Sequence, residues 1–126
     1  MMSDLPQRVY RVISKEDWIM AQDTGLIPRC DSDNRDGFVH LSTSDTMLET
    51  AQLYFDPEEH PLIIEILASM LGPDLCWESV PSRGDQLFPH LYAEGIPLHT
   101  VIAQISLQTE PEGFILGSRV ALRYPS

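Results

Sequence analysis

Residues 62–67, Leu-Ile-Ile-Glu-Ile-Leu, constrain the fold of this chain more than any other segment. The run is almost continuously apolar, and Gly72-Pro73 closes the segment that follows it. A run of this length and character is typical of a central strand that is covered on both faces of a sheet. Glu65 is the exception: its carboxylate must pair with a cation, emerge at the rim of the sheet or serve a function.

Two helices are expected in the first half of the chain. Residues 9–13 have the composition of a strand, and Ser14 after them can cap a helix that begins at Lys15 and stops at Gly25. Residues 42–44, Ser-Thr-Ser, are expected to cap a second helix. The apolar stripe of that helix has helical spacing and consists of Met47, Ala51, Tyr54 and Phe55.

Strands outnumber helices in the rest of the chain. Short strands are expected at residues 38–41, 75–80, 101–107, 114–116 and 120–122, and a single helical turn at 96–98. With 126 residues the chain fits one domain. The pattern predicts an α+β fold built on a bent or split, largely antiparallel sheet.

Charge and cysteine content narrow the class of partner. Nineteen acidic residues against eight basic ones give a formal net charge of -11, which repels duplex DNA and long RNA. The sequence has neither an apolar run of about eighteen residues nor a signal-peptide pattern, so no membrane span is expected and the cytoplasm is the expected location. Two widely spaced cysteines predict neither a disulfide framework nor a zinc site.

Two histidine-bearing segments form the candidate site. In each, an aromatic residue stands two positions before the histidine, Phe38 before His40 and Phe88 before His90. Alternation along a strand places Phe38 and His40 on one face. Residues 27–37 have the turn formers and charges of a long loop, which we expect to act as a lid beside His40.

Side chains near these histidines suit an anionic, hydroxyl-bearing ligand. Ser42 and Thr43 at a helix amino terminus can bind a phosphate or carboxylate, and Arg83 can clamp it with two hydrogen bonds. His40 can hold a sugar hydroxyl or transfer a proton, with a second group completing the transfer. The catalytic candidates are His40, His90 and Glu78, and the ligand-binding candidates are Ser42, Thr43, Arg83, Tyr92, Arg35 and Tyr10.

The order of these residues resembles the DUF952 family of small uncharacterised bacterial proteins. The resemblance is carried by Tyr10, Trp18, Gly37-Phe38-Val39-His40-Leu41-Ser42-Thr43, Trp77-Glu78 and Leu87-Phe88-Pro89-His90-Leu91-Tyr92. It covers about residues 8–107 and implies a DUF952-like domain there. Residues 1–7 are then expected to form a disordered or extended tail, and residues 108–126 a C-terminal extension with two short strands. Residues 93–98 depart from the family pattern.

A weaker resemblance links the strand-borne His40 and the residues after it to the ADP-ribosyltransferase-like fold. It implies NAD as the cofactor, with His40 at a ribose hydroxyl and Ser42 and Thr43 beside the nicotinamide. A carboxylate orients the reacting group in that fold, and neither Glu78 nor Glu65 stands in a matching motif.

Three functions are left open by the sequence. The first is a small nucleotide-binding protein that uses NAD or ADP-ribose, either as a transferase of the ADP-ribosyl or phosphotransferase type or as a degenerate form of one. The second is a metal-dependent hydrolase with His40, His90 and Glu78 as ligands. The third is a non-catalytic module whose acidic surface faces a basic protein partner. The oligomeric state is not determined by the sequence.

Overall fold

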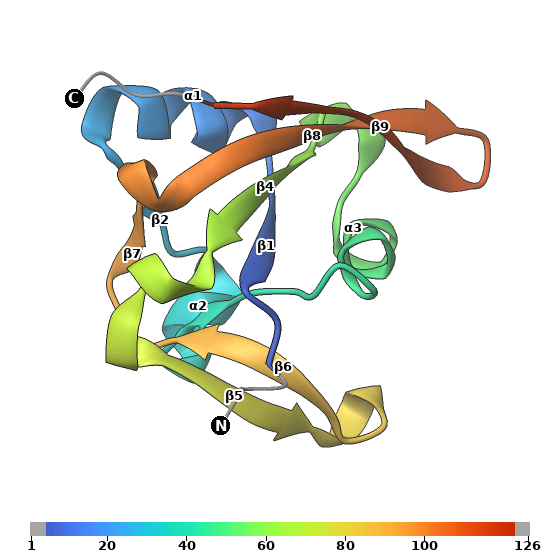
Figure 1. The fold of residues 1–126 in the computed structure, drawn as a ribbon. Coiled ribbons are helices and arrows are strands. Elements are labelled where there is room, and N and C mark those ends of the chain that lie inside the picture. The colour runs from blue at the N-terminus through green and yellow to red at the C-terminus, as the bar shows by residue number, and fades with distance from the viewer. Residues whose placement is uncertain (1–4, 123–126) are drawn as a thin grey trace.

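Antiparallel strands and short helices make up the fold, which a computed structural model describes for residues 5–122 (Figure 1). The strands are β1 (Arg8–Ile13), β2 (Leu26–Pro28), β3 (Val39–His40), β4 (Leu62–Leu67), β5 (Leu75–Val80), β6 (Gln86–Leu91), β7 (Gly95–Pro97), β8 (Val101–Glu110) and β9 (Gly113–Ala121). The α-helices are α1 (Lys15–Thr24), α2 (Asp31–Asp36) and α3 (Met47–Tyr54). Single 3-10 turns are η1 (Pro57–Glu59), η2 (Ala68–Met70), η3 (Gly72–Asp74), η4 (Pro81–Arg83) and η5 (Leu98–Thr100).

The strands form a sheet that is split in two. The larger sheet has the strand order β1-β4-β8-β9, the smaller one has the order β3-β6-β5, and β2 pairs with β7. The two sheets meet where Tyr10 and Ser42 exchange backbone hydrogen bonds of 2.8 and 2.7 Å. Neighbouring strands of the described residues run antiparallel. The prediction of a single α+β domain with a split, largely antiparallel sheet is confirmed.

Strand β4 lies inside the larger sheet and is buried on both faces. Ile64 and Ile66 pack with Ala21 of α1 in one hydrophobic core. Ile63 points the other way and packs with Met47 of α3 in a second core. All three isoleucines are 0% exposed. The prediction of a covered central strand at residues 62–67 is therefore confirmed.

Glu65, the polar residue of β4, is held by cations from the two edge strands of the larger sheet. Arg119 of β9 donates to both carboxylate oxygens at 2.9 and 2.7 Å, and Nε of Arg8 in β1 lies 3.1 Å away. Glu65 is 3% exposed. The hydrogen bonds from Arg119 outweigh the effect of burial and lower the pKa of Glu65. Of the three alternatives for Glu65, the structure shows the first, pairing with cations.

Residues 27–37 are not the loop that the sequence predicts, because they contain helix α2. The backbone N–H of Cys30 donates to the Asp33 carboxylate at 2.9 Å before the helix, and Gly37 ends it in the left-handed region at φ 86°. The six helical residues are Asp-Ser-Asp-Asn-Arg-Asp. The sequence of α2 has no apolar periodicity, and for this reason the helix was not expected. Residues 5–122 therefore contain three α-helices where two were predicted.

Residues 42–44 do not cap helix α3, contrary to the prediction. The N-cap is Thr46, and Ser42 is instead fixed by its backbone exchange with Tyr10. The backbone oxygen of Thr43 accepts a hydrogen bond of 3.0 Å from the backbone N–H of Met47. The Thr46 hydroxyl accepts a hydrogen bond of 3.0 Å from the backbone N–H of Thr43. The join between the two sheets keeps Ser42 extended, and this delays the start of the helix.

The C-terminal part also differs from the expectation. Residue Ile96 lies in β7, so the helical turn expected at 96–98 comes later, as η5. In place of two short strands, β9 is continuous through Gly117. A Cβ at Gly117 would lie 2.2 Å from the Ser106 hydroxyl oxygen, so glycine allows the close approach of β8 and β9.

Both termini extend beyond the described residues. The tail expected at residues 1–7 is described from residue 5 only, and the backbone oxygen of Gln7 accepts the N–H of Ala68 at 2.9 Å. The extension 108–126 is described up to residue 122. None of the helices within residues 5–122 has the length and apolar character needed to span a bilayer.

Candidate functional site

The outer face of the smaller sheet brings the two histidine segments together. His40 of β3 and His90 of β6 are cross-strand partners, and their ring centroids lie 5.8 Å apart. Val39 and Leu91 point to the opposite side and belong to the first hydrophobic core. Glu78 is on β5, the strand on the other side of β6. Strand alternation therefore places both imidazoles on one surface.

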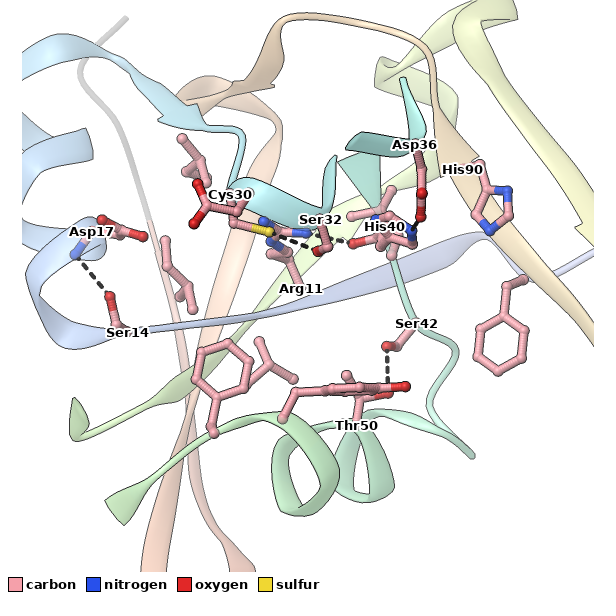
Figure 2. Close-up of a pocket in the computed structure, with 18 of the residues that line it drawn as sticks. Arg11, Ser14, Asp17, Cys30, Ser32, Asp36, His40, Ser42, Thr50 and His90 are labelled. Atoms are coloured by element: carbon pink, nitrogen blue, oxygen red, sulfur yellow. Dashed lines mark hydrogen bonds and ion pairs between the residues drawn. The ribbon is translucent and has the colours of Figure 1, made fainter. Parts of the chain in front are cut away.

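A cleft of about 650 Å³ opens beside this face, between β1 on one side and α2, α3 and β6 on the others (Figure 2). Its polar lining includes Arg11, His40, Ser42, Thr50, Arg83 and His90. Tyr54, Phe55 and Phe88 add aromatic surface. The cleft follows the line along which the two sheets separate.

His90 presents one ring nitrogen to this cleft. Its Nδ1 lies 2.8 Å from Oε1 of Glu78, and the Tyr92 hydroxyl donates to the same oxygen at 2.6 Å. Phe38 stacks on the imidazole with centroids 4.0 Å apart and planes at 22°. The His90 side chain is 8% exposed and lines the cleft, and its Nε2 has no hydrogen-bond partner among the described residues.

The hydrogen bonds that Glu78 accepts from Tyr92 and His90 keep its carboxyl group ionised. The bond from Tyr92, followed by that from His90, lowers the pKa of Glu78. The bond to Glu78 raises the pKa of Tyr92 to about 12. Glu78 is therefore a carboxylate at neutral pH and favours a proton on Nδ1 of His90. A neutral imidazole in that tautomer offers a lone pair at Nε2.

His40 is held between two carboxylates of α2. Its Nδ1 lies 2.7 Å from Oδ1 of Asp33, and its Nε2 lies 2.9 Å from Oδ2 of Asp36. The ring can donate to both carboxylates only when it carries two protons. Both nitrogens of His40 are thus engaged by the protein.

Asp33 is 0% exposed and organises this side of the cleft. Its oxygens accept two hydrogen bonds from the Arg11 guanidinium at 3.3 and 2.7 Å and the backbone N–H groups of Cys30 and His40 at 2.9 and 3.0 Å. Burial raises the pKa of Asp33, but hydrogen bonds from His40 and Arg11 outweigh it and hold that pKa far below its usual range. Charged contacts therefore anchor α2 to β1 and β3.

Comparison with known proteins assigns the family. Residues 12–104 match the family described as "Protein of unknown function (DUF952)". The chain belongs to the DUF952 family. It is similar to the X-ray crystal structure of protein CC0527 from Caulobacter crescentus, with 31% sequence identity, a TM-score of 0.76 and coverage of 85% of this chain and 91% of that chain. It is also similar to the solution NMR structure of CC0527, with 30% sequence identity, a TM-score of 0.71 and coverage of 86% of this chain and 91% of that chain. No curated protein matches the chain.

Some of the predicted site residues of this DUF952 protein line the cleft and others do not. Those that line it are His40, His90, Ser42, Arg83 and Arg35. Glu78 and Tyr92 contact each other and flank His90 without lining the cleft. Thr43 is buried against Thr46, and Tyr10 is buried in the second core. The roles assigned to these residues stay predictions.

Three side chains of this DUF952 site were not predicted. Arg11 stands between apolar neighbours in a strand, and such a buried-strand cation is a usable signal for a charged partner. Asp33 is one of several acidic residues in a polar segment and carries no such signal. Phe38 was placed on the face of His40, but its stacking on His90 depends on the pairing of β3 with β6.

The proposed ligand set of His40, His90 and Glu78 does not form a metal-binding group. Both nitrogens of His40 face aspartates, and Nδ1 of His90 faces Glu78. Within residues 5–122 no group of three or more His, Cys, Asp or Glu side chains is arranged to hold a metal ion. The geometry gives no support to the two-histidine, one-carboxylate hypothesis for this DUF952 protein.

Proposed function

We propose that this protein binds a nucleotide of the NAD or ADP-ribose class in the cleft and that His90, oriented by Glu78, transfers a proton there. The observation that carries the proposal is the state of the His90 ring. One nitrogen is fixed on a carboxylate at 2.8 Å, and the other meets the cleft without a protein partner in the described chain. Polar atoms in such positions are normally satisfied by a ligand or water.

The arrangement suits general base catalysis. The lone pair at Nε2 of His90 can accept the proton of a ribose hydroxyl or a water, and the Glu78 carboxylate stabilises the imidazolium that forms. Activation of an accepting hydroxyl is the step that a transferase of the ADP-ribosyl or phosphotransferase type needs. A protein that binds the ligand without turnover would use the same nitrogen as a hydrogen-bond acceptor.

Size and lining support a nucleotide as the ligand. A volume of about 650 Å³ falls within the range of roughly 300–1,000 Å³ typical of small-molecule sites. Tyr54 and Phe55 offer flat surfaces for a base, and the hydroxyls of Ser42 and Thr50 can bond to a ribose. The ADP-ribosyltransferase-like resemblance of the sequence points to the same ligand class, as an analogy of fold.

His40 has a different part in this proposal. The ribose contact expected for it stays a prediction, but its ring nitrogens face Asp33 and Asp36. Its clearest contribution is to hold α2 at the cleft, where Asp31, Ser32 and Asp36 line the wall. The lid function expected for residues 27–37 would then belong to a helix.

Isothermal titration calorimetry of the full chain with NAD, ADP-ribose and adenosine monophosphate tests the proposal. We expect saturable binding of at least one of them, weakened about ten-fold or more by His90→Gln because a hydrogen bond to the ligand is lost. His99→Gln is the matched control, since His99 is exposed and lies outside the cleft. Absence of binding by all three nucleotides at millimolar concentration would refute the proposal.

Partner class and location belong to the same proposal. The net charge of -11 opposes binding of duplex nucleic acid, so the ligand is a small molecule that the cleft can screen from the overall field. Cys30 and Cys76 are free thiols, which fits a reducing compartment such as the cytoplasm.

A further inference from the structure

Three arginines of the described chain line the cleft, and each donates to a carboxylate of the same chain. The Arg11 guanidinium is buried and donates to both oxygens of Asp33 and to the backbone oxygen of His40. Arg35 donates to Asp36 and is largely exposed to solvent. Both guanidinium groups are thus bonded to aspartates of α2.

Arg83 on turn η4 differs from both. Its guanidinium lies over the ring of Phe88, 4.7 Å from the centroid, and its side chain is 15% exposed. It donates through Nη2 to Glu49 of α3, and its Nε and Nη1 have no protein acceptor within residues 5–122. Glu49 is 61% exposed, so this ion pair can open with little loss. Arg83 therefore has donors to spare.

Phe88 links the Arg83 guanidinium to the strand that carries His90. Phe88 and His90 are alternate residues of β6 and share one face of the sheet. Arg83, Phe88 and His90 all line the cleft. A guanidinium kept planar against an aromatic ring presents its N–H groups in the fork that matches a phosphate.

Apart from Arg83, the cleft is lined by more acidic than basic side chains, since four carboxylates stand against Arg11 and Arg35. The carboxylates that line it belong to Asp17, Asp31, Asp36 and Glu59. Figure 2 shows Asp17 at the end of the cleft away from His90. A second anionic group along the cleft would approach these carboxylates and be repelled. The charge distribution thus favours one anionic group at Arg83 and an uncharged or cationic remainder.

We infer that the cleft selects a mononucleotide, whose single phosphate binds Arg83 beside His90, over ligands that carry a diphosphate. The inference rests on the part of the proposed function that places a nucleotide in this cleft, and it changes the preferred ligand from NAD or ADP-ribose to one of their mononucleotide halves. With the phosphate at Arg83, the ribose of the ligand lies next to Nε2 of His90. The base then extends toward the acidic end, which suits a donor-rich or positively charged ring.

The test compares the two halves of NAD with the whole. Calorimetric titration of the full chain uses adenosine monophosphate and nicotinamide mononucleotide, then NAD and ADP-ribose, with adenosine as the phosphate-free probe. We expect at least one mononucleotide to bind about ten-fold tighter than NAD and ADP-ribose, and adenosine monophosphate to bind tighter than adenosine. Arg83→Gln removes the preference for the phosphate. Arg8→Gln is the matched control and retains it, because Arg8 also pairs with a glutamate but lies outside the cleft.

Charge variants test the inference a second time, because it predicts the direction in which each variant changes the ligand affinity. Glu49→Gln releases Arg83 from its protein partner, so the affinity for the mononucleotide rises; an Arg83 that serves only the fold predicts no gain. Asp17→Asn lowers the repulsion at the end of the cleft away from His90, so the difference in affinity between the mononucleotide and ADP-ribose becomes smaller. The gain in Glu49→Gln keeps the test decisive even if Arg83→Gln fails to fold.

Two results separate this inference from the proposed function. If NAD or ADP-ribose binds more tightly than both mononucleotides, or Arg83→Gln still prefers adenosine monophosphate to adenosine, the inference is overturned and the proposed function stands. If no nucleotide binds at millimolar concentration, both fail.

Discussion

The two histidines of the smaller sheet are cross-strand neighbours with opposite surroundings. His40 has a carboxylate on each ring nitrogen, whereas His90 has one on Nδ1 and no protein partner on Nε2 in the described chain. The local sequence does not explain the contrast, since a phenylalanine precedes each histidine by two positions. The contrast comes from α2, whose Asp33 and Asp36 both bond to His40.

This difference gives the two neighbouring histidines separate roles. An imidazole with carboxylates on both nitrogens has a structural role, because it has no nitrogen left for a ligand. An imidazole with one nitrogen oriented and the other open has the geometry of a proton-transfer group. His40 and the ion pairs around it anchor α2, and His90 keeps an open nitrogen for the proposed ligand.

The largest effect on stability is expected for Asp33→Ala, which tests this contrast by removing the partner of Arg11 and one partner of His40. Breaking a buried ion pair leaves an uncompensated charge and costs roughly 3–5 kcal/mol of unfolding free energy. Asp36→Ala is the matched control on the same helix, and we expect a much smaller loss because Asp36 is partly exposed. Urea denaturation followed by circular dichroism measures both variants.

Equal losses in the two aspartate variants would contradict the role assigned to Asp33. They would mean that α2 is not anchored through the Arg11 pair, and His40 would then lose its distinction from His90.

The two histidines are compared directly in His40→Gln and His90→Gln. The first removes hydrogen bonds to two carboxylates and should cost about 1–2 kcal/mol of stability, a moderate figure because the ring is partly exposed. The second should cost less stability, because Glu78 is accessible to water, but should lose most of the nucleotide affinity. Urea denaturation and calorimetric titration are run on both proteins. The reverse pattern, with ligand affinity lost in the His40 variant alone, would exchange the two roles.

The parts of this fold that follow from the sequence are those with local patterns. The apolar run of β4, the cap and stop of α1 and the alternation of β3 each depend on neighbouring residues, so all are predictable. Alternation also indicates that Phe38 and His40 share a face. The meeting of His40 with His90 was expected from their similar settings, but its register depends on strands far apart in sequence.

The parts of the fold that cannot be predicted from the sequence are held by long-range polar contacts. Helix α2 has only polar residues, and Arg11, 22 positions before Asp33, supplies the ion pair that fixes it. The late start of α3 depends on the backbone exchange of Ser42 with Tyr10. Such contacts leave no periodic trace. The sequence could therefore point to both histidines as site residues but not assign them different roles.

The smallest expected effect concerns Tyr92, which shares the Glu78 carboxylate with His90. The pKa of Tyr92 is raised from about 10 to about 12 by its hydrogen bond to Glu78. The folded state therefore favours the protonated phenol: the stabilising contribution is complete below about pH 10 and is lost as the pH rises through about 12. Ultraviolet absorbance of tyrosinate during alkaline titration follows the group, and Tyr92→Phe assigns it among the four tyrosines. Glu78→Gln should return the Tyr92 midpoint toward its ordinary value, because the charge that holds the phenolic proton is gone. An unchanged midpoint in that variant would show that Glu78 does not carry the charge on which the orientation of His90 depends, and the two histidines would then differ only by the carboxylates of α2.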